Sequence, residues 1–158
     1  MSIEIGTKAP QFTLEDDTGA KVSLRDFAGR WVVLYFYPRA DTPGCTKEAC
    51  EFTADIAAFE GMDADVVGVS PDRAPALAKF RAKYGLKVRL LGDPGKETLA
   101  AYDAWGTKKL YGKETVGVKR STVIVDPAGR VAHHWKSVKA AGHAAFVRAK
   151  LAELRAAK

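Results

Sequence analysis

The chain has 158 residues, of which 47% are apolar and 28% charged, so we expect one globular domain over residues 1–158 whose core needs no disulfides. Its formal net charge of +6 is spread through segments such as KFRAKYGLKVR and GTKKLYGKETVGVKR without a zinc-finger, homeodomain or RNA-binding signature, which argues against a nucleic-acid partner. The start MSIEIGTKAP lacks the features of a secretory signal, and no apolar run approaches the roughly 18 residues of a membrane span, so we expect a cytoplasmic protein without a membrane partner.

The first part of the chain predicts strands followed by one long helix. Residues 6–24 form short apolar pairs around the turn DDTG, which indicates two short strands. The run WVVLYFY at residues 31–37 is rich in β-branched and aromatic side chains and predicts a strand buried on both faces, ended by a proline. Apolar side chains then recur at spacings of four and three from Cys45 to Phe59, which predicts an amphipathic helix closed by Gly61.

The second part continues the alternation of strands and helices. A buried strand in DVVGVS precedes a helix over residues 72–84, and a short strand in VRLLGD precedes a helix near residues 96–102. Residues 105–119, rich in glycine and lysine, are predicted to form a loop, STVIVDPAGRVAHHW a hairpin, and residues 144–157 a last helix. This order predicts an α/β domain with a mixed central β-sheet flanked by helices, which a thioredoxin-like fold satisfies.

Both cysteines, Cys45 and Cys50, lie in YPRADTPGCTKEAC, where the strand is expected to become a helix. In a reducing compartment, two cysteines close in sequence are more often catalytic or metal-binding than structural. With Thr42 as N-cap and Pro43 as the first helical residue, Cys45 falls in the first turn, where unpaired amides and the helix dipole favour a thiolate. The alternative is an inert buried cysteine.

A thiolate at Cys45 would not by itself make a fast enzyme. An ordinary cysteine is about 3% ionised at neutral pH, so full ionisation raises its reactivity at most about thirtyfold. A hydroxyl and a fixed cation directed at the breaking bond are also needed. Thr42 is the candidate hydroxyl, and Arg120 is the candidate cation because a strand of the same sheet can end beside the loop that begins at Pro38. Taken alone, Thr42 could be only a helix cap and Arg120 only a surface arginine.

The spacing between the cysteines argues against a static bond. Five residues along an intact helix place the Cα atoms of Cys45 and Cys50 about 8.6 Å apart, whereas a disulfide needs less than about 7 Å. A bond between them therefore requires the helix to unwind locally. The spacing is not C-x-x-C, and the adjacent His133 and His134 would point to opposite faces of a strand, so we expect no metal site there or with His143.

The segment PRADTPGC matches the signature P-x-x-x-T-x-x-C, and the chain resembles the peroxiredoxin Q, or bacterioferritin comigratory protein, subfamily of the peroxiredoxins. The likeness extends along nearly the whole chain, through GTKAPQFTLEDDTGAKVSLRDFAG, VVLYFYPRADTPGCTKEACEF, VVGVSPD, WGTKKLYGK and GVKRSTVIVDPAGRV. It implies a thiol peroxidase that reduces hydrogen peroxide and organic hydroperoxides, serves antioxidant defence, needs no cofactor or metal, is recycled by thioredoxin and is usually monomeric.

The resemblance also implies residue roles. Cys45 would be the peroxidatic cysteine, which becomes a sulfenic acid, and Cys50 the resolving cysteine, which forms an intramolecular disulfide with it. The implied active-site threonine and arginine, the proline that shields the sulfur and the glutamate that orients the arginine are Thr42, Arg120, Pro38 and Glu48. From chain position, residues 105–119 would form a rim of the pocket.

Two other functions are compatible with parts of the same sequence. A non-enzymatic redox sensor or holdase would use the same disulfide to expose a partner surface, and sustained peroxide turnover separates it from an enzyme. A thiol-disulfide oxidoreductase would ordinarily carry C-x-x-C, which this chain lacks.

Overall fold

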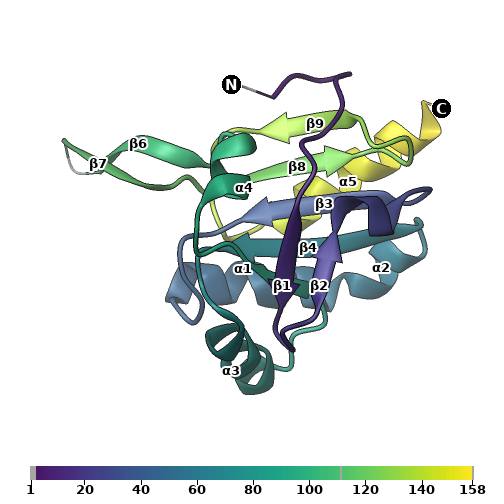
Figure 1. Ribbon diagram of the computed structural model, residues 1–158. Helices are drawn as coiled ribbons and strands as arrows, with labels where there is room; N and C mark the ends of the chain where they lie inside the picture. Colours follow the sequence, from purple (N-terminus) through teal and green to yellow (C-terminus); the bar gives the residue numbers. More distant parts are fainter. Residues whose placement is uncertain (1–2, 111, 158) are drawn as a thin grey trace.

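Seven strands hydrogen-bond in the order β2-β1-β5-β4-β3-β8-β9, and two further strands, β6 and β7, form a separate hairpin. The computed structural model describes residues 3–110 and 112–157 (Figure 1). In chain order the elements are β1 (Thr13–Asp16), β2 (Lys21–Ser23), the 3-10 helix η1 (Leu24–Phe27), β3 (Trp31–Phe36), α1 (Pro43–Ala54), α2 (Ile56–Glu60), β4 (Ala64–Ser70), α3 (Ala74–Tyr84), β5 (Arg89–Gly92), α4 (Glu97–Ala101), β6 (Trp105–Leu110), β7 (Lys113–Val118), β8 (Ser121–Val125), β9 (Val131–Trp135) and α5 (His143–Ala156).

The sheet is mixed, as predicted. Strands β5, β4 and β3 run parallel, and the strands on either side of them pair antiparallel with their neighbours. The parallel connections pass through helices, which cover the sheet and exclude water from its centre. Every position of β3 is buried for this reason.

Alternate side chains of β3 pack into two apolar clusters, one on each face of the sheet. Val33 and Tyr35 pack with side chains of α1, α2, α3 and α5. Val32 and Leu34 pack on the other face with side chains of η1 and α4 and with the strands β1 and β2. Among the described residues, no helix has the length and apolar character needed to cross a membrane.

The predicted helix from Cys45 to Gly61 is interrupted. Helix α1 ends at Ala54, and Asp55 leaves the helical conformation with φ −96° and ψ 6°, after which α2 begins. The apolar periodicity runs across this break because Phe52 of α1 and Phe59 of α2 are buried in the same cluster. Spacing alone therefore could not reveal it.

The predicted loop over residues 105–119 is wrong, because most of this segment is the β6–β7 hairpin. The two strands pair antiparallel with Gly106 opposite Gly117, and Figure 1 shows the hairpin extending away from the central sheet. Most positions of β7 are exposed, so the strand lacks the alternation of apolar and polar residues that marks a half-buried strand. The expected strands, the C-terminal hairpin and the other helices are confirmed within a few residues at their ends.

Beneath α1, the ring of Tyr35 lies close against the backbone of Gly68. Tyr35 of β3 is paired with Gly68 of β4, and a Cβ added to Gly68 would lie 2.6 Å from the ring carbon Cζ of Tyr35. Both residues sit in the buried centre of the sheet, where a shift of the ring would displace the neighbouring aromatic side chains. Glycine is therefore required at position 68 for steric reasons.

We predict that Gly68→Ala lowers the free energy of unfolding by roughly 1–3 kcal/mol, as overpacking of a buried site does. Urea unfolding followed by circular dichroism measures this. Gly61→Ala is the matched control, because its nearest new contact would be an ordinary 3.4 Å and its backbone is helical, so it should be neutral or slightly stabilising. Equal urea midpoints for Gly68→Ala and the wild type would contradict the close approach.

Candidate active site

Three chain segments meet at one edge of the sheet because of strand direction. Phe36, the last residue of β3, pairs with Val69 near the end of the parallel strand β4 and with Ser121 at the start of the antiparallel strand β8. The loop that begins at Pro38 and the residue Arg120 therefore come together at this edge, as the sequence predicted.

Cys45 lies in the first turn of α1, also as predicted. Thr42 is the N-cap in an extended conformation, with φ −96° and ψ 156°, and Pro43 is the first helical residue. The first helical hydrogen bond runs from the Thr46 amide to the Thr42 carbonyl, 2.8 Å, so the amides of Gly44 and Cys45 precede the helical ladder. They are placed to stabilise negative charge next to the sulfur, although the Cys45 residue itself is only 1% exposed.

Arg120 binds two groups of α1 at once. Its Nη2 donates to the Cys45 Sγ at 3.2 Å, and its Nη1 donates to the Glu48 Oε1 at 2.7 Å. A Cβ on Gly44 would lie 3.2 Å from Nη2, so the glycine lets the guanidinium lie against the start of the helix. Because a guanidinium can only donate, the sulfur is the acceptor of this contact.

Glu48 is a buried carboxyl on the inner side of this arrangement. Its side chain is fully buried beside Arg120, and its second oxygen, Oε2, accepts no hydrogen bond from the described part of the chain. Burial raises the pKa of Glu48 to about 7, although the Arg120 guanidinium acts to lower it. The carboxyl therefore changes charge in the neutral range.

Thr42 and Pro38 are less directly engaged. The Thr42 hydroxyl donates to the Arg39 carbonyl at 3.0 Å, so its proton is directed at the loop rather than at the sulfur. Pro38 is half-buried and lines the same surface hollow as Arg120. The structure thus joins Cys45, Glu48 and Arg120 by direct contacts and places the other two at their margin.

Cys50 lies on the same uninterrupted helix as Cys45, and both are free thiols. Cys50 is half-buried and packs against the apolar cluster beneath α1. Since α1 is regular over both positions, the two sulfurs cannot be bonded in this arrangement, as the sequence spacing predicted.

Two carboxylates that hold the loop before α1 were missed from the sequence. Asp72 Oδ2 accepts from the Ala40 amide at 2.7 Å and from the Ser70 hydroxyl at 2.8 Å. Asp41, which has a left-handed φ of 61°, accepts from the Tyr84 hydroxyl at 2.6 Å. A usable signal existed for Asp72, because side chains after neighbouring parallel strands meet at the same sheet edge.

A buried histidine lies behind Arg120. His143 Nε2 is 2.7 Å from the Thr122 Oγ1, and its ring packs edge-on against Phe52 and Trp135. Burial, together with the nearby Arg120 charge, lowers the pKa of His143 to about 4, so the ring is neutral at physiological pH. Within residues 3–110 and 112–157, no group of three His, Cys, Asp or Glu side chains could hold a metal ion.

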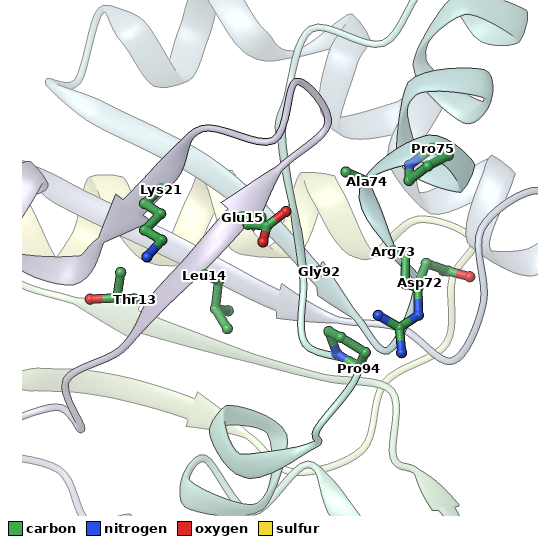
Figure 2. A pocket seen from close by; sticks show the side chains of 10 residues that line it. All are labelled: Thr13, Leu14, Glu15, Lys21, Asp72, Arg73, Ala74, Pro75, Gly92 and Pro94. Atoms are coloured by element: carbon green, nitrogen blue, oxygen red, sulfur yellow. The ribbon is translucent and has the colours of Figure 1, made fainter.

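Two surface hollows flank the sheet edge. One, of about 430 Å³, is lined by Pro38 and Arg120 together with residues of the β6–β7 hairpin and of the segment after β9. Hairpin residues thus form a rim beside Arg120, as expected, but from strands rather than from a loop. A larger hollow of about 550 Å³ lies where β1 approaches the start of α3, with Glu15 and Arg73 on either side of Gly92 (Figure 2), and it holds none of the predicted site residues.

Residues 5–134 match the AhpC/TSA family. A putative peroxiredoxin of Mycobacterium tuberculosis is 50% identical over 143 residues, covering 90% of this chain and 91% of the relative, and the peroxiredoxin Bcp of Bacillus subtilis is 45% identical over 145 residues, covering 92% of each. The bacterioferritin comigratory protein of Xanthomonas campestris, for which alkyl peroxide reduction is described, has a structure that superposes with a TM-score of 0.88 at 36% identity, covering 95% of this chain and 98% of the other.

We predict that Glu48 makes stability fall with rising pH. The folded carboxyl, with a pKa of about 7, keeps a proton that the unfolded chain, with a pKa of 4.5, has released. Between pH 4.5 and pH 7 the folded state binds more protons than the unfolded state. The stabilising contribution of protonated Glu48 to the free energy of unfolding is therefore fully present below about pH 4.5 and is lost as the pH rises through 7. Urea unfolding at pH 5 and pH 8 should therefore show that wild type loses stability relative to Glu48→Gln.

The matched control is Glu60→Gln on α2, since Glu60 is exposed. Its difference from wild type should be the same at both pH values. A difference between wild type and Glu48→Gln that does not change from pH 5 to pH 8 would rule out the raised pKa.

Proposed function

This chain belongs to the AhpC/TSA family and, as its Bcp and PrxQ relatives show, is a peroxiredoxin, a thiol peroxidase, and we propose that Cys45 is the sulfur that reacts with peroxide. The observation that carries this assignment is the 3.2 Å contact from Arg120 Nη2 to the Cys45 Sγ at a helix start. Among the described residues, no cationic side chain donates to the Cys50 sulfur, and Cys50 packs against the apolar cluster further along α1.

The oxidation step transfers one oxygen atom to Cys45. The thiolate attacks the terminal oxygen of a hydroperoxide, the S–O bond forms as the O–O bond breaks, and the departing alkoxide takes up the proton that the thiol released. Sulfur is oxidised to sulfenic acid, and the peroxide is reduced to an alcohol, or to water from hydrogen peroxide. Arg120 and the amides at the helix start stabilise the charge that moves from sulfur to the leaving oxygen.

We assign Thr42 a positioning part in this step. Its own proton is donated to the Arg39 carbonyl, which leaves the lone pairs of its oxygen free. The oxygen is thus available to accept the hydrogen of the hydroperoxide and to turn the terminal oxygen toward the sulfur. Pro38, beside Arg120, limits the access of water, and Glu48 fixes the orientation of the guanidinium.

The second half of the cycle returns Cys45 to a thiol. After the start of α1 unwinds, the Cys50 thiol attacks the sulfenic sulfur, water leaves, and a disulfide forms within the chain. A dithiol such as thioredoxin then reduces this disulfide by exchange and becomes a disulfide itself. A reducing, cytoplasmic location suits this cycle.

We further propose a monomer with one domain. The two apolar clusters share one sheet, which supports a single folding unit. The most exposed large apolar side chains of the described residues, Ile5, Val116 and Phe146, lie on three different segments of the chain and do not gather on one element as an interface patch would.

Mass spectrometry tests the two cysteine roles. With one equivalent of hydrogen peroxide, wild type should lose both thiols and about two mass units within a second, Cys50→Ser should gain about sixteen as a sulfenic acid, and Cys45→Ser should keep its thiol. Peroxide turnover with a catalytic amount of protein and a dithiol reductant separates an enzyme from a sensor. Oxidation of Cys45→Ser at the wild-type rate would overturn the assignment.

We predict that Asp72→Asn loosens the loop before α1, because it weakens a charge-assisted bond to the Ala40 amide. Oxidation of Cys45 should become several-fold slower, and the Cys45–Cys50 disulfide should then form faster than in wild type. Stopped-flow tryptophan fluorescence resolves the two steps. Asp16→Asn, which alters an exposed turn after β1, is the control, and unchanged rates for both steps in Asp72→Asn would refute the anchoring role.

A further inference from the structure

The 430 Å³ hollow beside Arg120 is strongly cationic. Four of the eight residues that line it are basic, and none of the described lining residues is acidic. Three are lysines on three different segments: Lys108 on β6, Lys119 between β7 and β8, and Lys136 after β9. The hollow is also much larger than hydrogen peroxide requires and falls in the range of pockets that bind organic molecules.

The three lysines lack an acidic partner within the described part of the chain. Among the described residues, no carboxylate lies within ion-pair distance of Lys108, Lys119 or Lys136, whereas Lys47, Lys83 and Lys150 elsewhere each pair with an acid. Lys108 donates one hydrogen bond, to the Val118 carbonyl at 2.9 Å, which leaves two of its N–H groups for another acceptor.

The hairpin is shaped to hold two of these lysines. Gly106 and Gly117 face each other across β6 and β7. A Cβ on Gly106 would lie 3.4 Å from the Lys119 Nζ, and one on Gly117 would lie 3.3 Å from the Lys108 Cε. The two glycines, which have no side chains, therefore leave room on the hairpin surface for the side chains of Lys108 and Lys119. These lysine side chains pack against the hairpin.

Arg120 connects this hollow to the reactive sulfur. Its guanidinium donates to the Cys45 Sγ, and the same residue lines the hollow. A molecule whose peroxide group reaches the sulfur past Arg120 would thus have the rest of its structure among the lysines. Uncompensated positive charge in a hollow raises the local concentration of anions and stabilises them once bound.

We propose that the hollow binds the carboxylate of an organic hydroperoxide, so that the enzyme favours carboxylate-bearing hydroperoxides over neutral ones of the same shape. The inference rests on the proposed function of Cys45. The carboxylate takes no part in bond making or breaking: the terminal peroxide oxygen goes to sulfur, and the substrate leaves as a hydroxy acid. Lys108, Lys119 and Lys136 are specificity-determining residues in this proposal.

The test uses two probes of nearly the same shape, cumene hydroperoxide with a negatively charged para-carboxylate and its neutral methyl ester. Oxidation of reduced protein by each is followed by stopped-flow fluorescence at low salt. Wild type should react about tenfold faster with the acid than with the ester, because each exposed ion pair changes an equilibrium constant by roughly two- to threefold. The preference should shrink with added salt.

In the variant Lys108→Gln/Lys119→Gln/Lys136→Gln the ratio of acid to ester rates should fall to near one. The control Lys8→Gln/Lys79→Gln/Lys87→Gln removes the same net charge at exposed positions that do not line the hollow, and it should keep the wild-type ratio. The single variant Lys136→Gln, which leaves the hairpin intact, should lower the ratio roughly two- to threefold.

Equal rates with acid and ester in wild type, or a preference that survives in the triple variant, would overturn the proposal. Reduction of the preformed disulfide by thioglycolate and by its methyl ester is the second arm. If removal of the three lysines changes only the rate of disulfide reduction by thioglycolate, the hollow binds an anionic reductant rather than the substrate, and the proposal fails. Hydrogen peroxide serves as the separate check on function: if it leaves Cys45 unoxidised, the peroxidatic assignment itself is at fault.

Discussion

The proposed active site depends on the position of one guanidinium. Arg120 donates to the Cys45 sulfur and to the Glu48 carboxylate through different nitrogens, and the planar fork of an arginine suits this double contact in a way that a lysine ammonium does not. Its place is fixed by the backbone, because Arg120 precedes β8 and its carbonyl accepts from the Val138 amide at 3.0 Å. The pairing of β8 with β3 therefore decides where the cation lies relative to the helix start.

The groups around Arg120 are arranged so that its charge is only partly balanced. Glu48, with a pKa raised to about 7 by burial, is negative for only part of the time at neutral pH. His143 is kept neutral by burial and by the arginine itself. Positive charge thus remains beside the Cys45 sulfur, where the proposed reaction would use it to stabilise the departing oxygen anion, and a stronger permanent counter-charge would reduce this effect.

The sequence predicted the strands of the central sheet and the meeting of Cys45 with Arg120, because buried strands leave a clear apolar pattern and their directions fix which ends meet. It did not predict the β6–β7 hairpin, whose exposed, glycine- and lysine-containing strands lack that pattern, or the break at Asp55, across which the apolar spacing continues. Asp72 left only the signal of its position after a buried parallel strand, because a bond from a side chain to a loop amide has no periodic signature. The direction of the Thr42 hydroxyl likewise depends on the fold of the loop.

In the proposed cycle, the break between α1 and α2 limits how far unwinding of the helix can spread. Helical order is cooperative along unbroken hydrogen-bonded turns, so melting that begins at Cys45 loses this coupling at Asp55. Beyond that point Phe59 remains in the apolar cluster with Ala64 and Val66 of β4. In the proposed cycle the backbone thus separates the segment that unwinds, about three helical turns long, from a scaffold that stays folded.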